Sequence, residues 1–262
     1  MTLDFDDHLA RESDDFLTAV LAADPAARVP GCPDWDADDL LWHLAEVQHF
    51  WAYVIRTRPA PPKDYADPER PADRAGIEAF YRAASADLRA QLAEAGDEEE
   101  AWTWHDSIHT VGFIRRRQAH EALIHRVDAE QAAGLPSVLD PALASDGAVE
   151  CIEWMYAGAP DWGTYVPTGE RIALEIVDID ARPVIGLGRF SGTDPKSGEE
   201  RDDEDLELVS ASSTEPADAV VHGTAADLDL WLWHRGPLDA LTVTGDAAVF
   251  GRLSTILGQP VN

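Results

Sequence analysis

The residues best suited to metal chemistry lie in the segment AHEALIHR, at positions 119–126. Zinc proteases carry H-E-x-x-H, in which two histidines four residues apart share one face of a helix. His120 and His125 are five apart, so on a helix they point about 140° away from each other and cannot bind one ion together. Glu121 and His125 are four apart and do share a face. The segment therefore contains an E-x-x-x-H pair rather than the protease motif.

A metal site needs a third ligand besides Glu121 and His125, because catalytic zinc combines three protein ligands with one open position. His43 is the best candidate, since it lies on the apolar side of a helix predicted for residues 36–57. Asp128 could orient His125 from the same helix. A purely structural role stays open as the alternative for each residue. Glu121 and His125 would form a solvated pair, His43 would be a hydrogen-bonded core histidine, and Asp128 would form a helix-stabilising pair or a cap.

The composition bears on which partners are possible. The chain has 262 residues, is 45% hydrophobic and carries a formal net charge of −30, which repels nucleic acids and anionic membrane surfaces. No apolar run reaches membrane-spanning length, and the acidic N-terminus MTLDFDDHLA is unlike a signal peptide. Two cysteines provide no disulfide framework. We therefore expect a soluble, cytoplasmic protein that binds small molecules and neither nucleic acid nor membranes.

The first half of the chain has the pattern of helices. Apolar residues recur at helical spacing, and proline-rich or acidic segments separate the stretches. The predicted helices cover residues 5–21, 36–57, 73–95 and 110–133. Asp36 is a good N-cap, followed by acidic residues in the favoured first turn. Long helices joined by loops indicate an antiparallel bundle, and a shorter helix near residues 148–156 would close this domain.

The second half changes to the pattern of strands. Strands are predicted in the segments RIALEIVDI, PVIGLGRF, LELVSA, AVVHG and ALTVTG. Two helices follow Thr224 and Asp246, which are suitable N-caps. Residues 157–170 have the composition of a turn-rich joint, and residues 191–205 that of a solvated acidic loop. This density of strands and short helices indicates a small α+β domain.

Three stretches of the chain resemble a known family. They are VPGCPDWDADDLLWHLAEVQHFW, RRRQAHEALIHRVDAE and VVHGTAADLDLWLWHRGPLDALTVTGDAAVFGRL. Together they resemble the mycothiol-dependent maleylpyruvate isomerase family of the DinB-like superfamily, and the resemblance covers most of the chain. It implies a DinB-like four-helix bundle at residues 1–157, followed by a sterol carrier protein-like α+β domain at residues 168–262. The expected fold class is therefore α plus α+β.

The resemblance also implies a metal and a thiol cosubstrate. In this family a divalent metal, usually zinc, is held by one histidine of the second helix and an E-x-x-x-H pair of the fourth, positions that match His43, Glu121 and His125. Nickel, cobalt, manganese or iron could load the same donors. Family members commonly use mycothiol, the low-molecular-weight thiol of actinobacteria. A metal-bound thiol is deprotonated at neutral pH and can add to an electrophilic carbon.

Arg235 is a further candidate, for catalysis and for cofactor binding. In the segment LWLWHRG it matches an arginine that looks characteristic of the family's C-terminal domain. A guanidinium can hold a carboxylate of the substrate or of the thiol in bidentate fashion. The alternative is a helix-end arginine that satisfies backbone carbonyls.

These features favour a metal- and thiol-dependent isomerase or S-transferase that acts on a small electrophile. An isomerase would release the thiol after rotation about the attacked double bond, whereas a transferase would keep the adduct. One alternative is a non-catalytic protein that keeps a structural metal and binds a ligand or partner. Another is a metal hydrolase that uses bound hydroxide. Three ligands form a poor structural zinc site, which favours an enzyme.

Overall fold

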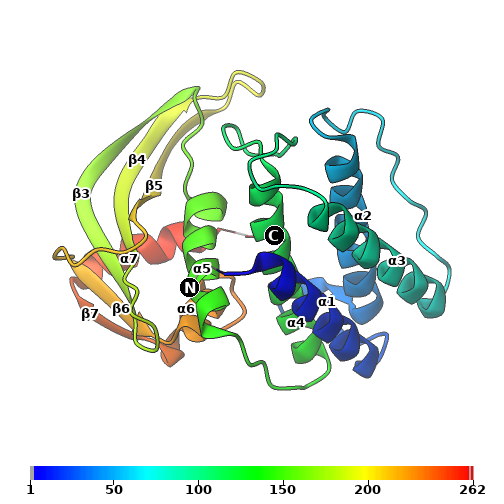
Figure 1. Ribbon diagram of the computed structural model, residues 1–262. Coiled ribbons are helices and arrows are strands. Elements are labelled where there is room, and N and C mark those ends of the chain that lie inside the picture. Colours follow the sequence, from blue (N-terminus) through cyan, green and yellow to red (C-terminus); the bar gives the residue numbers. More distant parts are fainter. Residues whose placement is uncertain (1–2, 260, 262) are drawn as a thin grey trace. The chain divides into compact units, whose positions relative to one another are not determined.

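The chain folds into two compact units, Met1–Ser137 and Val138–Asn262 (Figure 1). The computed structural model describes residues 3–259 and residue 261. The first unit, called the helical unit, is built mainly from helices, and the second, called the sheet unit, combines a sheet with helices. This order of a helical and an α+β unit confirms the fold class that the sequence predicts.

In the described part of the chain, the helical unit contains four long helices. Their bounds are α1 Phe5–Ala22, α2 Ala37–Thr57, α3 Arg74–Ala93 and α4 Val111–Ala132. Asp36 accepts a hydrogen bond from the Asp39 N–H at 2.9 Å, and the Asp39 carboxylate accepts one from the Asp36 N–H at 3.2 Å. This reciprocal capping fixes where α2 begins. No helix among the described residues is both long and apolar enough to cross a membrane.

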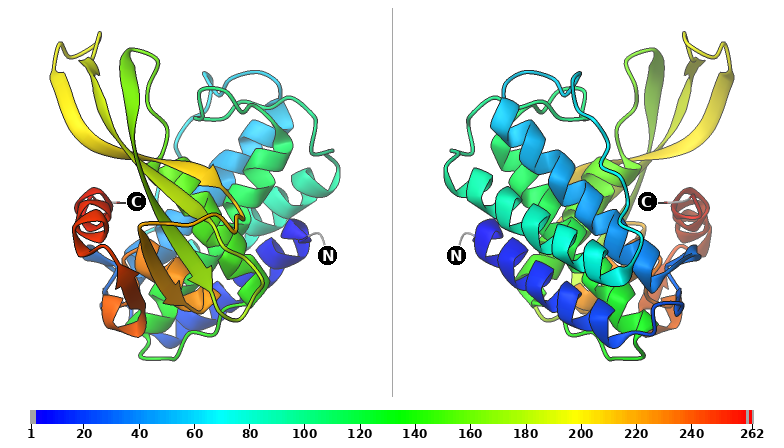
Figure 2. Two further views of the ribbon diagram at one scale, coloured as in Figure 1. Left: turned by 90° about the vertical axis from the view of Figure 1, so that its left-hand side faces the viewer. Right: turned by 90° about the vertical axis from the view of Figure 1, so that its right-hand side faces the viewer.

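Neighbouring helices of the bundle do not all run antiparallel. Arg74 at the start of α3 pairs with Asp38 at the start of α2, with Nη1 and Oδ1 3.0 Å apart. Arg56 near the end of α2 pairs with Asp87 of α3, so the two helices run in the same direction, side by side in Figure 2. The antiparallel prediction is wrong for this pair, because the proline-rich segment 58–73 is long enough to return along the bundle.

The core of the helical unit lies between these helices. Its largest fully buried side chains are Tyr81, Phe16, Leu9, Leu40, Leu41, Leu44, Ile55, Leu88, Leu92, Ile114 and Leu123. Burying one side chain of this size is worth roughly 1.5–3 kcal/mol. The Tyr81 hydroxyl donates to the Ser13 carbonyl at 2.8 Å, and Gln48 Nε2 donates to Ser13 Oγ at 2.9 Å. α4 is buried along most of its length, so the side chains that it carries are held in fixed positions.

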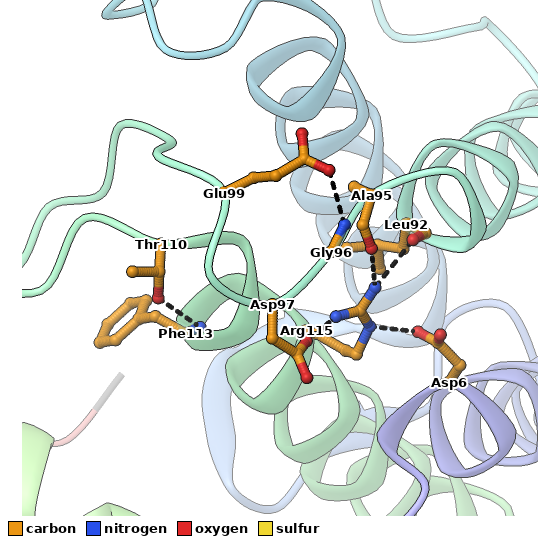
Figure 3. A network of polar contacts seen from close by, with 9 residues as sticks. All are labelled: Asp6, Leu92, Ala95, Gly96, Asp97, Glu99, Thr110, Phe113 and Arg115. Atoms are coloured by element: carbon orange, nitrogen blue, oxygen red, sulfur yellow. Dashed lines mark hydrogen bonds and ion pairs between the residues drawn. The ribbon is translucent and has the colours of Figure 1, made fainter.

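Arg115 of α4 ties three helices of this unit together (Figure 3). Its Nη2 donates to the carbonyls of Leu92 and Ala95 at the end of α3, both at 2.8 Å. Its Nε donates to Asp6 of α1 at 2.8 Å, and its Nη1 donates to Asp97. The last carbonyls of a helix have no partner within the helix. This guanidinium therefore fastens the end of α3 to α1 and α4.

A short hairpin precedes α2. Strands β1 (Arg28–Val29) and β2 (Cys32–Asp36) pair antiparallel, in a segment where the sequence predicts only a break. Pro33 is tolerated because a two-stranded hairpin consists of edge strands. β2 ends at the N-cap of α2, so it places Trp35 directly before the helix that carries His43.

Among the described residues, the sheet unit contains a five-stranded sheet of order β5-β4-β3-β6-β7. The strands are β3 Gly163–Ile176, β4 Val184–Thr193, β5 Glu200–Ser210, β6 Ala219–Gly223 and β7 Thr242–Gly245. The helices are α5 Pro141–Glu150, α6 Ala225–Leu232 and α7 Ala247–Leu257, with a π-helical turn at Cys151–Tyr156 and a 3₁₀ turn at Leu238–Ala240. β3 and β6 are parallel, and the other neighbours are antiparallel. Thr224 and Asp246 cap α6 and α7, as predicted.

Two strands are longer than the sequence predicts. β3 begins at Gly163, within residues 157–170 that were expected to be turn-rich. β5 begins at Glu200, within the acidic segment 191–205. β4 lies between them and pairs with both out to its last residues. Backbone pairing with a neighbouring strand therefore overrides local composition here.

The boundary between the units falls between Ser137 and Val138, not after residue 157, where the sequence predicts the helical domain to end. α5 and the π-helical turn belong to the sheet unit, because both contact α6 and the turn also contacts β5. The Tyr156 hydroxyl donates to the Leu232 carbonyl of α6 at 2.8 Å. The shorter helix of the sequence analysis therefore belongs to the second unit.

Candidate metal centre

The side chains of His43, Glu121 and His125 converge between α2 and α4. One ligand atom from each lies within 4.8 Å of the others. Glu121 Oε1 is 3.6 Å from His43 Nε2 and 3.1 Å from His125 Nε2. α4 supplies Glu121 and His125 one turn apart on one face, and α2 supplies His43. The structure thus brings together the three residues that the sequence analysis gives as metal ligands.

This group of donors fits a divalent metal such as zinc. Zinc bonds to histidine nitrogen and carboxylate oxygen at about 2.0–2.2 Å, so tetrahedral donors lie roughly 3.3 Å apart. The two separations from Glu121 Oε1 bracket this value. Two imidazoles and one carboxylate are also a ligand set of catalytic zinc sites. Side-chain rotations that draw the three donors, which lie within 4.8 Å of one another, closer together would let them hold one ion.

Asp128 fixes the orientation of His125. Its Oδ2 lies 3.0 Å from His125 Nδ1, and its carboxylate is fully buried. An ionised carboxylate only accepts hydrogen bonds, so Nδ1 carries a proton while Nε2 faces Glu121. Metal-binding histidines are commonly held in this way by a carboxylate behind them. Of the interpretations that the sequence allows for Asp128, the geometry favours the orienting one.

Interactions within the group shift the pKa values of its acid and its base. Burial acts to raise the pKa of Glu121, but hydrogen bonds from His125 and His43 and the charges of His125 and Arg117 hold it well below its usual range. Burial acts to lower the pKa of His125, but Asp128 and Glu121 raise it to about 9. In the metal-free protein His125 is therefore protonated at neutral pH. A metal ion has to displace this proton, because only an unprotonated nitrogen binds metal.

Two residues beside the candidate ligands are not predicted from the sequence. Arg117 Nη2 donates to the second oxygen of Glu121, Oε2, at 3.1 Å. The Trp35 ring centroid lies 4.6 Å from that of His43 and 6.3 Å from that of His125. The four-residue spacing of Arg117 and Glu121 is a signal that reveals the first contact. The local sequence holds no signal for the second, because the β1–β2 hairpin sets the position of Trp35.

Two further histidines of these helices, His120 and His49, lie outside the donor group. His120 is buried and packs edge-on against Phe5, with ring centroids 6.0 Å apart. His49 Nδ1 lies 2.9 Å from the Tyr65 hydroxyl. Both placements agree with the angles that separate these residues from the candidate ligands on their helices.

Arg235 lies in the sheet unit, just after α6. Its Nη1 donates to the Trp233 carbonyl at 2.7 Å, and its backbone N–H donates to the Leu230 carbonyl at 2.7 Å. These contacts satisfy carbonyls at the end of a helix, as the alternative interpretation of this residue requires. Carboxylate binding by Arg235 stays a prediction.

A cleft of about 320 Å³ opens in the helical unit beside His43. It is lined by Trp35, Asp39, Trp42, His43, Glu46 and Arg70. Because His43 belongs both to the donor group and to the cleft wall, a molecule in the cleft lies next to the candidate metal-binding atoms. The arrangement is therefore suited to chemistry between a metal-held group and a second molecule.

Two family models match the chain in succession. The mycothiol maleylpyruvate isomerase N-terminal domain matches residues 7–130, and the MDMPI C-terminal domain matches residues 142–252. Similar solved structures include crystal structures of a mycothiol-dependent maleylpyruvate isomerase and of its histidine-to-alanine mutant. Both are 15% identical to this chain and cover 94% of it and 98% of their own chain, with TM-scores of 0.55 and 0.58; this likeness shows a shared fold. No curated protein sequence is significantly similar to the chain.

Proposed function

The chain belongs to the mycothiol maleylpyruvate isomerase family, and we propose that it is a metal- and thiol-dependent enzyme, an isomerase or S-transferase that acts on a small electrophile. The observation that carries this proposal is the convergence of His43, Glu121 and His125 beside a cleft. Three protein donors leave one coordination position open, which a substrate-binding metal needs and a structural zinc does not.

Each residue of the site has a task in this proposal. His43, Glu121 and His125 hold the metal, for which zinc is the default with this donor set. Asp128 keeps the proton on His125 Nδ1, so that Nε2 is directed at the ion. Arg117 holds the second oxygen of Glu121. When bound, a divalent metal ionises a coordinated thiol at neutral pH.

Mycothiol is the thiol in the names of the family and of the solved relatives, and we take it as the cosubstrate. Its thiolate would add to an electrophilic carbon of the substrate. In an isomerisation the new C–S bond breaks again after rotation about the former double bond, and in a transfer the bond is kept. Both reactions require the same three metal-binding residues. A cytoplasmic location, where thiols stay reduced, is part of the proposal.

Arg235, within the matched C-terminal domain, is proposed to bind a carboxylate of the substrate. A planar guanidinium binds a carboxylate through two parallel hydrogen bonds, which a lysine does not reproduce. Arg235→Lys should raise the KM of a carboxylate-bearing substrate about tenfold and leave the metal content unchanged. Equal KM values in the variant and the wild type would remove this role.

Cobalt in place of zinc tests the role of the thiol. Cobalt(II) bound to a thiolate has an intense charge-transfer absorption, which cobalt bound to oxygen and nitrogen donors lacks. We expect mycothiol to produce this absorption with the cobalt-loaded wild type, and His125→Ala to bind cobalt too weakly to show it. A fully cobalt-loaded protein without this absorption at saturating mycothiol would overturn the proposal. Thiol-independent turnover of an ester or amide would then favour the hydrolase.

A further inference from the structure

The cleft beside His43 has a chemical character of its own. Two tryptophans, two carboxylates and one guanidinium line it together with His43. We propose that this cleft binds the hydroxyl-rich, uncharged part of the thiol cosubstrate, and so distinguishes mycothiol from smaller thiols. This inference rests on the proposed function, because it takes mycothiol to be the thiol that meets the metal.

The aromatic side of the cleft is held in place by packing. Trp35 packs against His43 with ring centroids 4.6 Å apart, and Trp42 packs against Phe80 with ring centroids 5.2 Å apart. Indole rings combine a flat apolar surface with one polar N–H. The C–H faces of sugar-like rings pack on such surfaces while their hydroxyls point outward. This wall therefore suits a ring that is apolar on its faces and polar at its rim.

The polar side of the cleft contains one ion pair and one carboxylate that is available to accept hydrogen bonds. Asp39 Oδ1 accepts from Arg70 Nη1 at 2.5 Å, and Oδ2 accepts from the Asp36 N–H at 3.2 Å. This pair holds Arg70 at the cleft. Glu46, one turn after His43 on α2, makes no hydrogen bond or ion pair with any residue that the structure describes. Its carboxylate can therefore accept hydrogen bonds from ligand hydroxyls.

The charge of the cleft discriminates between the two reactants. Asp39 and Glu46 each carry a negative charge and Arg70 carries a positive one, so the cleft lining has an excess of one negative charge. The whole chain has a formal net charge of −30. An anionic electrophile is repelled by this balance, whereas an uncharged polyol is not. Mycothiol carries its thiol on a cysteine that is joined by an amide to two hydroxyl-rich rings. Because His43 lines both sites, a thiol at the metal donors has its adjoining rings next to the cleft.

Calorimetric titration of the zinc-loaded full-length protein tests this assignment. The probes are mycothiol and N-acetylcysteinamide, which has the same thiol-bearing end, including the uncharged amide, without the rings. We expect the wild type to bind mycothiol at least tenfold more tightly than N-acetylcysteinamide. Glu46→Ala and Arg70→Ala should each weaken mycothiol binding about tenfold, as expected for a lost hydrogen bond to a charged group, and leave N-acetylcysteinamide binding unchanged.

The matched control is Glu69→Ala, which removes an exposed charge next to Arg70 outside the cleft lining. It should bind both thiols as the wild type does. Zinc content is measured for every variant. Because Glu46 lies on α2 and Arg70 in the loop before α3, either variant alone decides the question if the other folds poorly.

The outcomes separate this inference from the proposed function. If the zinc-loaded wild type binds both thiols equally well, the proposed function stands and the assignment of the cleft is wrong. If Arg70→Ala weakens binding of a dicarboxylate such as maleate and leaves mycothiol binding intact, the cleft belongs to the electrophile and the assignment is again wrong. If neither thiol binds, the proposed function fails and the inference fails with it.

Discussion

The fully buried carboxylate of Asp128 lies 3.0 Å from Nδ1 of His125 and directs the other ring nitrogen at Glu121. The three residues lie on one helix, at spacings of four and three residues. A single helical segment therefore carries two candidate metal donors and the group that orients one of them, and α2 has only to supply His43.

Replacing Asp128 with asparagine should weaken zinc binding tenfold to a hundredfold, the range seen when the carboxylate behind a metal-binding histidine is lost. The measurement is competition with a chromophoric chelator at neutral pH. Glu130→Gln is a matched control, because Glu130 lies on the same helix and pairs with Arg126 instead. Equal zinc affinity in Asp128→Asn and the wild type would show that Asp128 does not orient a metal ligand.

The metal-free protein should become less stable as the pH rises above about 6.5. The fold raises the pKa of His125 to about 9, from about 6.5 in an unfolded chain. The protonated imidazole therefore stabilises the fold fully below pH about 6.5, and this contribution disappears as the pH rises through about 9. A shift of this size corresponds to roughly 3 kcal/mol. Denaturant unfolding of the metal-free protein across this range measures the loss.

His125→Asn provides the control for that pH dependence, because it removes the titrating group from the helical unit. Its free energy of unfolding should change much less with pH over the same range. Zinc should bind more tightly at the higher pH, since the ion competes with the proton for His125. A metal-free wild type with constant stability between these pH values would be incompatible with the contacts of His125 to Asp128 and Glu121.

Arg115→Ala should lower the free energy of unfolding of the helical unit by about 2–3 kcal/mol, because it removes the donor to the Ala95 carbonyl, one of the donors to the Leu92 carbonyl and the ion pair with Asp6. Arg115→Lys should restore only part of this, since an ammonium lacks the planar fork that reaches several acceptors. Arg82→Ala, which removes an exposed pair with Glu78, should cost less than about 0.5 kcal/mol. Equal losses in Arg115→Ala and Arg82→Ala would refute the anchoring role.

Much of the fold follows from local signals in the sequence. Asp36, Thr224 and Asp246 begin helices where their capping chemistry predicts, because the cap and the first turn are sequence neighbours. The acidic start of β5 was not predictable in this way. Its strand conformation comes from pairing with β4, which is a tertiary interaction. The parallel course of α2 and α3 likewise depends on where a long loop returns.

The residues of the candidate site also differ in whether local sequence signals or tertiary packing determine their positions. Spacing alone indicates Glu121 and His125 as a pair, and the same helix periodicity sets His120 apart. His43 is recognisable as a candidate from its apolar surroundings and from the family resemblance, but its approach to Glu121 is set by the packing of α2 on α4. No local sequence pattern predicts the contact of Trp35 with the histidines, because the β1–β2 hairpin brings Trp35 to them.

The most direct test of the central claim is the zinc content of the protein purified without chelators, with His43→Ala and His49→Ala in parallel. His49 lies on the same helix as His43 and contacts Tyr65 rather than the donor group, so its variant controls for the loss of a histidine from α2. We predict about one zinc per chain in the wild type and in His49→Ala, and a large loss in His43→Ala. Equal zinc content in all three, or no divalent metal in the wild type even after incubation with zinc, would contradict the account.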